Sequence, residues 1–248
     1  MAVAANSSGN GTRVSQSATF MPCSAVIFDC DGVLVDSESV IVGSWTRWAH
    51  QVGIDPDTVL ATIHGRRSQD TVAEFIEPSR RTEALALIDS IEIEDASAVR
   101  PIPGAGGLVD PIPEDRWAVV TSGSRALVRA RLTAAGLPLP RVLITGQDVV
   151  RGKPDPLGYL AAAKALGVEP RSCVVLEDSL PGIRAARAVG TTRTWPACSR
   201  ATRASVASAS ISGITTSAPL ARMAAVSASG SLMSTVMALC ATCWAGAP

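Results

Sequence analysis

Short apolar runs separate longer, more polar stretches along the middle of this 248-residue chain. Each run is three or four residues long and carries no charged side chain. Such runs are typical of strands that are buried on both faces of a sheet. The pattern predicts four strands: Ala25–Phe28, Trp117–Val120, Val142–Ile144 and Cys173–Leu176.

Stretches of helical length follow the later runs, at Ser124–Ala135, Pro156–Leu166 and Pro181–Val189. A glycine closes each stretch, which is a common way for a helix to end. Alternating strands and helices predict right-handed crossovers and therefore an open parallel sheet with helices on both faces. We expect an α/β fold with a Rossmann-like parallel sheet core, which binds ligands beyond the carboxyl ends of its strands.

The periodicity changes after the first strand, where Trp45 and Trp48 belong to an apolar pattern with helical spacing. This change predicts an inserted α-helical domain, a cap that could lie above the strand ends as a lid. The expected division is a core formed by residues 22–36 and 101–190, with the helical cap at residues 37–100.

The two ends of the chain differ from the rest in composition. Residues 1–21 are rich in Ser, Asn and Gly, which predicts a disordered N-terminal extension. Residues 191–248 contain no Asp, Glu or Lys and are dominated by Ala, Ser and Thr, so we expect an atypical tail. Within it, Thr191–Trp195 resembles the remnant of one more strand, and the remainder resembles translation in a shifted frame.

Net charge and cysteine content bear on the possible binding partners and on the cellular compartment. The 22 basic and 22 acidic residues cancel, so the net charge gives no support for binding to nucleic acid or to an anionic membrane. The uncharged part of the tail is interrupted by Ser, Thr and Gly, which disfavours a membrane span. The cysteines, including the pair Cys240 and Cys243, are interpreted as reduced thiols of a cytoplasmic protein.

Polar residues occur where the predicted strands end. Asp29 and Asp31 follow the first strand as D-x-D, and Gly32 permits a sharp turn after them. An acidic turn of this kind also resembles the start of a calcium loop, but that loop would need oxygen ligands where Val33 and Leu34 stand. Two carboxylates at one strand end could supply the nucleophile and the proton donor that phosphoryl transfer requires.

The later strand ends add a possible anion site and metal site. Thr121, Ser122 and Gly123 offer hydroxyl and backbone N–H groups to an anion, although an ordinary helix N-cap explains them equally well. Glu177 and Asp178 are adjacent carboxylates, which suit magnesium or, alternatively, the start of a helix.

Four segments together resemble the motifs of haloacid-dehalogenase-superfamily phosphatases. They are FDCDGVLVDSE, VVTSGS, GKPDP and VVLEDSLPGI, and the resemblance covers about Ala25 to Gly190. It implies a catalytic set of Asp29, Asp31, Thr121 and Lys153: Asp29 as nucleophile, Asp31 as general acid and base, and the other two as ligands of the phosphoryl group. It also implies Mg²⁺ held by Asp29, the Asp31 backbone carbonyl, Asp178 and, directly or through water, Glu177.

The expected substrate is a small sugar or polyol phosphate, because the insert resembles the cap of phosphatases that act on such compounds. The resemblance is strongest at residues 63–71, where His64, Gly65, Arg66 and Arg67 could contact the substrate together with Ser122 and Gly123 of the core. Two alternatives stay open: a phosphosugar mutase of the same superfamily, and a non-catalytic or poorly folded protein caused by the atypical tail. The oligomeric state is not determined by the sequence.

Overall fold

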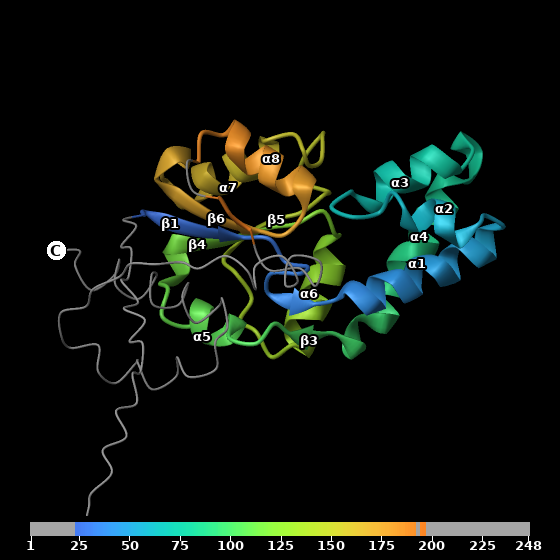
Figure 1. Cartoon of the computed structure of the whole chain (residues 1–248), viewed down its shortest axis with the longest axis horizontal. Helices are drawn as coiled ribbons and strands as arrows, with labels where there is room; N and C mark the ends of the chain where they lie inside the picture. Colours follow the sequence, from blue (N-terminus) through green and yellow to red (C-terminus); the bar gives the residue numbers. More distant parts are fainter. Residues whose placement is uncertain (1–22, 192–193, 197–248) are drawn as a thin grey trace, which may run out of the picture.

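A five-stranded parallel sheet forms the centre of the protein, whose computed structural model describes residues 23–191 and 194–196 (Figure 1). The strand order is β5-β4-β1-β6-β7, so the first strand of the chain is the central one. The strands are β1 (Ala25–Phe28), β4 (Trp117–Val120), β5 (Val142–Ile144), β6 (Cys173–Glu177) and β7 (Thr194–Pro196).

The predicted parallel sheet is confirmed, and three of its strands have the bounds that the apolar runs indicate. β1 pairs with β4 on one side and β6 on the other, in the register Val26↔Trp117 and Val26↔Val174. β6 extends one residue beyond its apolar run and ends at Glu177. The strand expected within 191–195 is present at Thr194–Pro196, parallel to β6.

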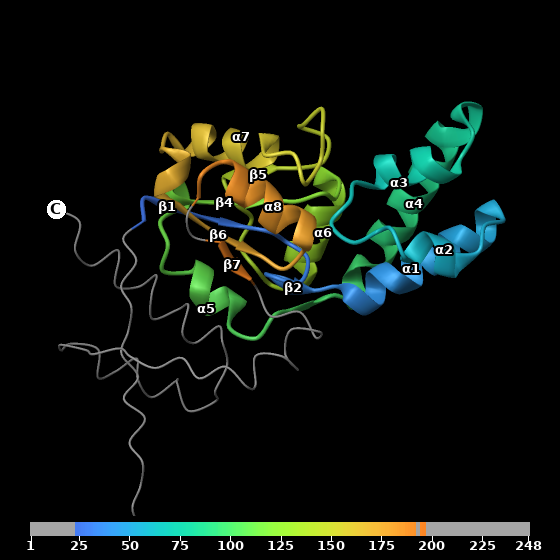
Figure 2. The same ribbon diagram turned by 45° about the horizontal axis from the view of Figure 1, so that its top comes forward.

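Helices cover both faces of the sheet, as Figures 1 and 2 show. Alternate residues of β1 serve the two layers: Val26 and Phe28 pack with α5 and α6, whereas Ala25 and Ile27 pack with α7 and α8. This alternation follows from the two-residue period of a strand. The four helices are α5 (Ala105–Val109), α6 (Arg125–Ala134), α7 (Leu157–Leu166) and α8 (Leu180–Ala188).

Local sequence signals explain where these helices begin and end. The Ser124 hydroxyl accepts a hydrogen bond from the backbone N–H of Leu127 at the start of α6. Gly167 ends α7 in the left-handed conformation that favours glycine. α5 is only five residues long and ends before Pro111, because proline cannot donate the next helical hydrogen bond.

Four helices between β2 and β3 form a separate apolar cluster, which we call the helical insert (Figure 1). Trp45, Trp48 and Ile88 lie at its centre, and the Trp48 indole N–H donates to the backbone carbonyl of Ala84 at 2.8 Å. The insert comprises α1 (Glu38–Val52), α2 (Pro56–Leu60), α3 (Ser68–Phe75) and α4 (Arg81–Asp95). Short 3-10 helices occur at Pro78–Arg80, Ala96–Ala98, Glu114–Arg116 and Pro170–Ser172.

The insert is joined to the sheet by two adjacent segments. β2 (Val35–Asp36) leads into α1 and β3 (Arg100–Pro101) returns after α4. The two are antiparallel partners, with Val35 opposite Pro101. The chain therefore leaves and re-enters the sheet region at one place, and that place is beside the D-x-D turn.

The expected extension 1–21, most of the tail and the pair Cys240 and Cys243 lie outside the described residues. Within the described part, every helix is too short or too polar to span a lipid bilayer.

Candidate active site

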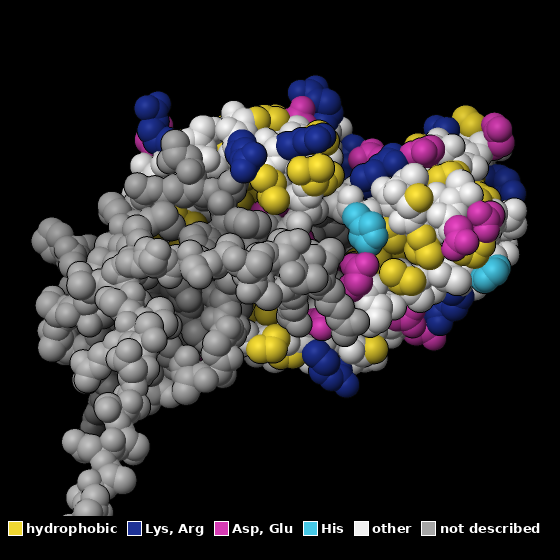
Figure 3. Space-filling view, viewed as in Figure 1, with side chains coloured by type: hydrophobic (Ala, Val, Ile, Leu, Met, Phe, Trp, Pro, Cys, Tyr) yellow, Lys and Arg dark blue, Asp and Glu magenta, His cyan; other side chains and the backbone are white. Residues whose placement is uncertain are grey.

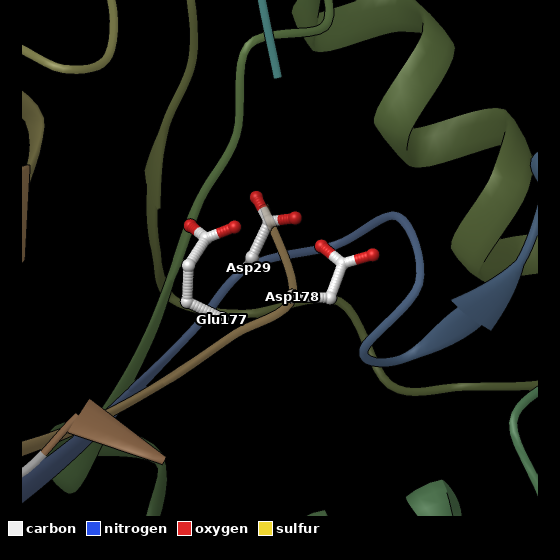
Figure 4. A group of neighbouring side chains, drawn as sticks. All are labelled: Asp29, Glu177 and Asp178. Atoms are coloured by element: carbon white, nitrogen blue, oxygen red, sulfur yellow. The ribbon is translucent and has the colours of Figure 1, made fainter. Parts of the chain in front are cut away.

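Polar side chains from several loops meet at the carboxyl edge of the sheet. Asp29 follows β1, Thr121 follows β4, Lys153 lies in the loop after β5, and Glu177 and Asp178 lie at the end of β6. Figure 4 shows the three carboxylates side by side and pointing the same way. β1 is hydrogen-bonded to β4 and β6, so the sheet itself gathers residues that are far apart in sequence.

Lys153 joins two of these carboxylates. Its Nζ donates to Asp29 Oδ1 at 2.6 Å and to Glu177 Oε2 at 2.7 Å. Burial disfavours the charged amine, but Asp29 and Glu177 outweigh burial and raise the pKa of Lys153 well above its usual value. The lysine is therefore a permanent positive charge beside the carboxylate that the sequence analysis identifies as the nucleophile.

Glu177 is fully buried, and both of its carboxylate oxygens are occupied. The Tyr159 hydroxyl donates to Oε2 at 2.5 Å, and the backbone N–H and hydroxyl of Ser179 donate to Oε1 at 3.0 and 2.8 Å. Gly182 leaves room for this carboxylate, because a Cβ at that position would lie 2.0 Å from its carbon. With its lone pairs filled, Glu177 is better placed for the water-mediated metal contact than for the direct one.

The remaining carboxylates are destabilised in their charged form. Burial raises the pKa of Asp29 well above its usual range, and the negative charge of Glu177 adds to the increase, whereas Lys153 opposes it. Burial, followed by the charge of Glu177, raises the pKa of Asp178 to about 7. Crowded, buried carboxylates of this kind are stabilised by a nearby cation.

The carboxylate cluster fits a divalent cation. One oxygen from each of Asp29, Glu177 and Asp178 lies within 4.8 Å of the others. Gly32 permits the close approach: its φ is +74°, and a Cβ there would lie 2.0 Å from Asp178 Oδ2. A set of carboxylate oxygens suits the hard ion Mg²⁺.

Asp31 points into a different network. Its Oδ1 accepts hydrogen bonds from the Ser37 hydroxyl at 2.7 Å and from Arg131 Nη1 at 2.9 Å. Arg131 Nη2 donates in turn to Glu92 Oε1 at 3.0 Å. Burial raises the pKa of Glu92 to about 7, although the charge of Arg131 opposes this. Three ionisable side chains, two from the sheet region and one from the insert, are thus linked.

A cavity of about 690 Å³ lies over these residues, between the sheet and the helical insert. Asp29, Thr121 and Lys153 line it from the sheet, and Trp45 and Ile63 line it from the insert. Figure 3 shows histidine and acidic side chains gathered on the surface where the insert adjoins the rest of the described chain. The cavity combines charged groups with apolar walls, which suits a small polar ligand that carries a hydrocarbon skeleton.

Residues of the predicted anion loop contact the insert. The Ser122 hydroxyl donates to the backbone carbonyl of Gly65 at 2.8 Å, and the backbone N–H of Gly123 donates to Thr121 Oγ1 at 3.1 Å. Gly65 has a φ of +73°, and a Cβ there would lie 2.9 Å from Ser179 Oγ. Its lack of a side chain lets the insert loop lie directly against two of the loops that carry the site.

His64 and Arg66 line the cavity at its outer part. His64 Nε2 lies 3.8 Å from Glu38 Oε1, and both side chains are more than half exposed. Arg66 forms an ion pair with Glu74 at 2.6 Å. His64 is exposed and Arg66 is partly exposed, and both residues line the cavity.

Arg67 occupies a different environment from Arg66 and is buried. Its Nε and Nη2 donate to the Asp70 carboxylate at 2.7 Å each, and Nη1 donates to the Val149 carbonyl at 2.8 Å. A Cβ at Gly152 would lie 2.8 Å from its Nε. Arg67 is not among the residues that line the cavity; it connects the insert to the loop that carries Lys153.

Arg131, Glu92 and Tyr159 were not predicted from the sequence. A signal was present, because Arg131 lies among the buried residues Leu127, Val128 and Leu132 of α6. A charged residue on the apolar stripe of a helix is unusual enough to mark a paired or functional group. Glu92 occupies the same kind of position on α4, after Ile88 and Ile91.

The sheet, its polar edge and the helical insert define a hydrolase of a known class. The family model of haloacid dehalogenase-like hydrolases matches residues 23–190, and the chain belongs to this family. It is 38% identical over 152 residues to hexitol phosphatase A of Escherichia coli, a match that covers 59% of this chain and 70% of that protein. It is 34% identical over 169 residues to 2-deoxyglucose-6-phosphate phosphatase 1 of Saccharomyces cerevisiae, covering 59% and 69% of the two chains.

The fold has similar solved structures. The crystal structure of CbbY from Rhodobacter sphaeroides in complex with phosphate matches with a TM-score of 0.61 and 25% identity, covering 70% of this chain and 86% of the other. The fold that the sequence predicted is therefore confirmed, and so is membership of the superfamily.

Proposed function

We propose that the protein is a magnesium-dependent phosphatase that hydrolyses a small sugar or polyol phosphate through an aspartyl-phosphate on Asp29. The observation that carries the proposal is the position of Lys153, whose Nζ donates hydrogen bonds to Asp29 and Glu177. The Asp178 carboxylate lies beside these two carboxylates. Lys153, together with Mg²⁺ held by the neighbouring carboxylates, would offset the charge of a phosphate dianion bound in this cavity of small-molecule size.

In the first step, a carboxylate oxygen of Asp29 attacks phosphorus and the ester P–O bond breaks. Asp31 gives its proton to the leaving oxygen, and the alcohol departs. In the second step, Asp31 takes a proton from water, which attacks the aspartyl-phosphate and releases inorganic phosphate. Lys153 and Thr121 hold the phosphoryl oxygens in both steps, and Ser122 and Gly123 border them.

Asp29, Asp178 and the Asp31 backbone carbonyl would hold Mg²⁺, with Glu177 assisting through water. When bound, the ion would offset the negative charge of the carboxylates and of the transferred group. The helical insert, residues 37–100, would act as the cap, and His64, Gly65 and Arg66 would contact the rest of the substrate. The relatives are named as phosphatases of sugar and polyol phosphates, which favours hydrolysis over a mutase reaction.

The test is phosphate release from a panel of sugar, polyol and short acid phosphates, with magnesium and with EDTA. We expect magnesium-dependent release that is greatest for a sugar or polyol phosphate. Asp29→Asn should lose at least about a thousandfold in turnover, because an amide does not replace the nucleophile. Asp57→Asn, on the exposed surface of α2, is the matched control. Equal activity in Asp29→Asn and the wild type would refute the proposal.

A further inference from the structure

The orientation of the Asp31 carboxyl depends on two donors that share one of its oxygens. Ser37 and Arg131 both donate to Oδ1, at 2.7 and 2.9 Å. Among the residues that the structure describes, Oδ2 has no hydrogen-bond partner, and the residue lines the cavity. Two donors on one oxygen fix the plane of the carboxyl and leave the other oxygen for a ligand.

Arg131 is itself held from the helical insert. It is 1% exposed and Glu92 is 3% exposed, and a 3.0 Å hydrogen bond joins the Arg131 guanidinium to the Glu92 carboxyl group. Within residues 23–191 and 194–196, the Nε of Arg131 has no hydrogen-bond partner, so the two Nη atoms carry its polar contacts. One Nη faces Asp31 and the other faces α4, which packs against α6. The direction of the guanidinium is therefore set jointly by the sheet region and by the insert.

Stability alone is a poor explanation for this arrangement. Burying two charged groups costs desolvation free energy, and the attraction between the two charges often does no more than offset this cost. Proteins in which well-packed apolar side chains replace a buried ion pair are commonly as stable. Here the pair borders the cavity and extends to Asp31, while the surrounding positions of α6 are apolar. The position of the pair therefore favours a role in holding the Asp31 carboxyl group.

We infer that Arg131 is a positioning residue that aims the Asp31 carboxyl at the leaving oxygen of the substrate, and that Glu92 holds Arg131 from the insert. The inference rests on the proposed function, in which Asp31 is the general acid. Under this inference, the Asp31 carboxyl is correctly oriented only while α4 packs against α6. Movement of the insert away from the sheet would then separate Glu92 from Arg131 and loosen the aim of Asp31.

The test compares esters that differ in their need for an acid. The first ester is an alkyl phosphate, the best sugar or polyol phosphate of the panel, whose alkoxide is a poor leaving group unless it is protonated. The second is p-nitrophenyl phosphate, whose p-nitrophenolate leaves as a stable anion without a proton. The ratio kcat/KM reports the steps up to departure of the alcohol, so hydrolysis of the aspartyl-phosphate does not enter. General acid catalysis contributes about a hundredfold or more to such steps.

The most informative variant is the double substitution Glu92→Leu/Arg131→Met, which replaces the buried ion pair with apolar side chains and leaves no unpaired charge between them. We expect kcat/KM to fall about a hundredfold for the alkyl ester and less than about fivefold for p-nitrophenyl phosphate. Arg131→Lys should show a smaller loss in the same sense, because one ammonium does not reproduce the guanidinium fork. Glu92→Gln should show the smallest loss.

Exposed residues on the same helices provide controls: Arg129→Met on α6 and Glu94→Gln on α4 should change neither ester. Thermal unfolding of each variant shows whether it is folded. Equal losses for both esters in folded Arg131→Lys and in the double variant would overturn the inference. Asp29→Asn and Asp31→Asn separate this outcome from failure of the proposed function: if Asp31→Asn affects both esters equally, the acid role of Asp31 itself is wrong.

Discussion

Replacing Gly182 with alanine should destabilise the protein, although the substitution lies inside a helix. In an ordinary helix interior, Gly→Ala stabilises by about 1 kcal/mol. In α8, however, the new methyl carbon would lie 2.0 Å from the carboxyl carbon of Glu177. That carboxylate is fully buried and accepts hydrogen bonds from Lys153, Tyr159 and Ser179, so moving it away would break these hydrogen bonds.

The magnitude follows from what must break. Displacing a buried, hydrogen-bonded carboxylate from its partners costs about 3–5 kcal/mol. After subtraction of the gain in helix propensity, we expect Gly182→Ala to lower the free energy of unfolding by about 3 kcal/mol. Lys153 would lose one of its two carboxylate partners, so phosphatase activity should fall as well.

Urea unfolding followed by circular dichroism measures this change. Gly43→Ala is the matched control: Gly43 lies inside α1, and no atom lies within 4 Å of its added Cβ. We expect that variant to be more stable than the wild type by about 1 kcal/mol. The reasoning about Glu177 is refuted if Gly182→Ala raises the unfolding midpoint as Gly43→Ala does.

Further substitutions and conditions test other parts of the site. Gly32→Ala should abolish magnesium-dependent turnover, because its Cβ would overlap the Asp178 carboxylate and its φ of +74° is strained for alanine; a magnesium titration of activity measures this. Since the pKa of Asp178 is raised to about 7, its proton competes with the metal below that pH. Magnesium affinity should therefore weaken by up to about tenfold per pH unit below pH 7 and become constant above pH 7. Isothermal titration calorimetry measures this affinity, and a constant affinity between pH 5 and pH 8 would contradict the prediction. Arg67→Leu should lower the free energy of unfolding by about 2 kcal/mol, because it removes the hydrogen bonds that the buried guanidinium donates to Asp70 and Val149. Arg66→Leu should cost less than about 1 kcal/mol, because its ion pair is partly exposed. Equal costs in urea unfolding would contradict the different burial of the two arginines.

The strands were predictable because each one is a short, uncharged apolar run. Ala25–Phe28, Trp117–Val120 and Val142–Ile144 agree with the observed bounds of β1, β4 and β5. Residues buried on both faces of a sheet must all be apolar, so the signal is local and strong. The end of β6 was misplaced by one residue because Glu177 is a charged side chain that the structure buries by pairing it with Lys153.

Contacts between distant segments were harder to predict. Arg67 resembles its neighbour Arg66 in sequence, yet one is buried against Asp70 and the other is partly exposed. Which of two adjacent arginines points inward depends on where the insert loop meets the loop after β5. Nothing local in the chain determines that meeting.

The sequence by itself determined the parallel sheet, the order of the four motifs and the helical character of the insert. These properties depend on period and on residue type within about a dozen neighbours, which the chain carries directly. Only the tertiary structure decided that Glu177 is saturated with hydrogen bonds and that Asp31 is linked through Arg131 to Glu92. Arg131 is 100 residues from Asp31 and 39 from Glu92 in sequence, and these charges meet only because packing of α4 against α6 removes them together from water.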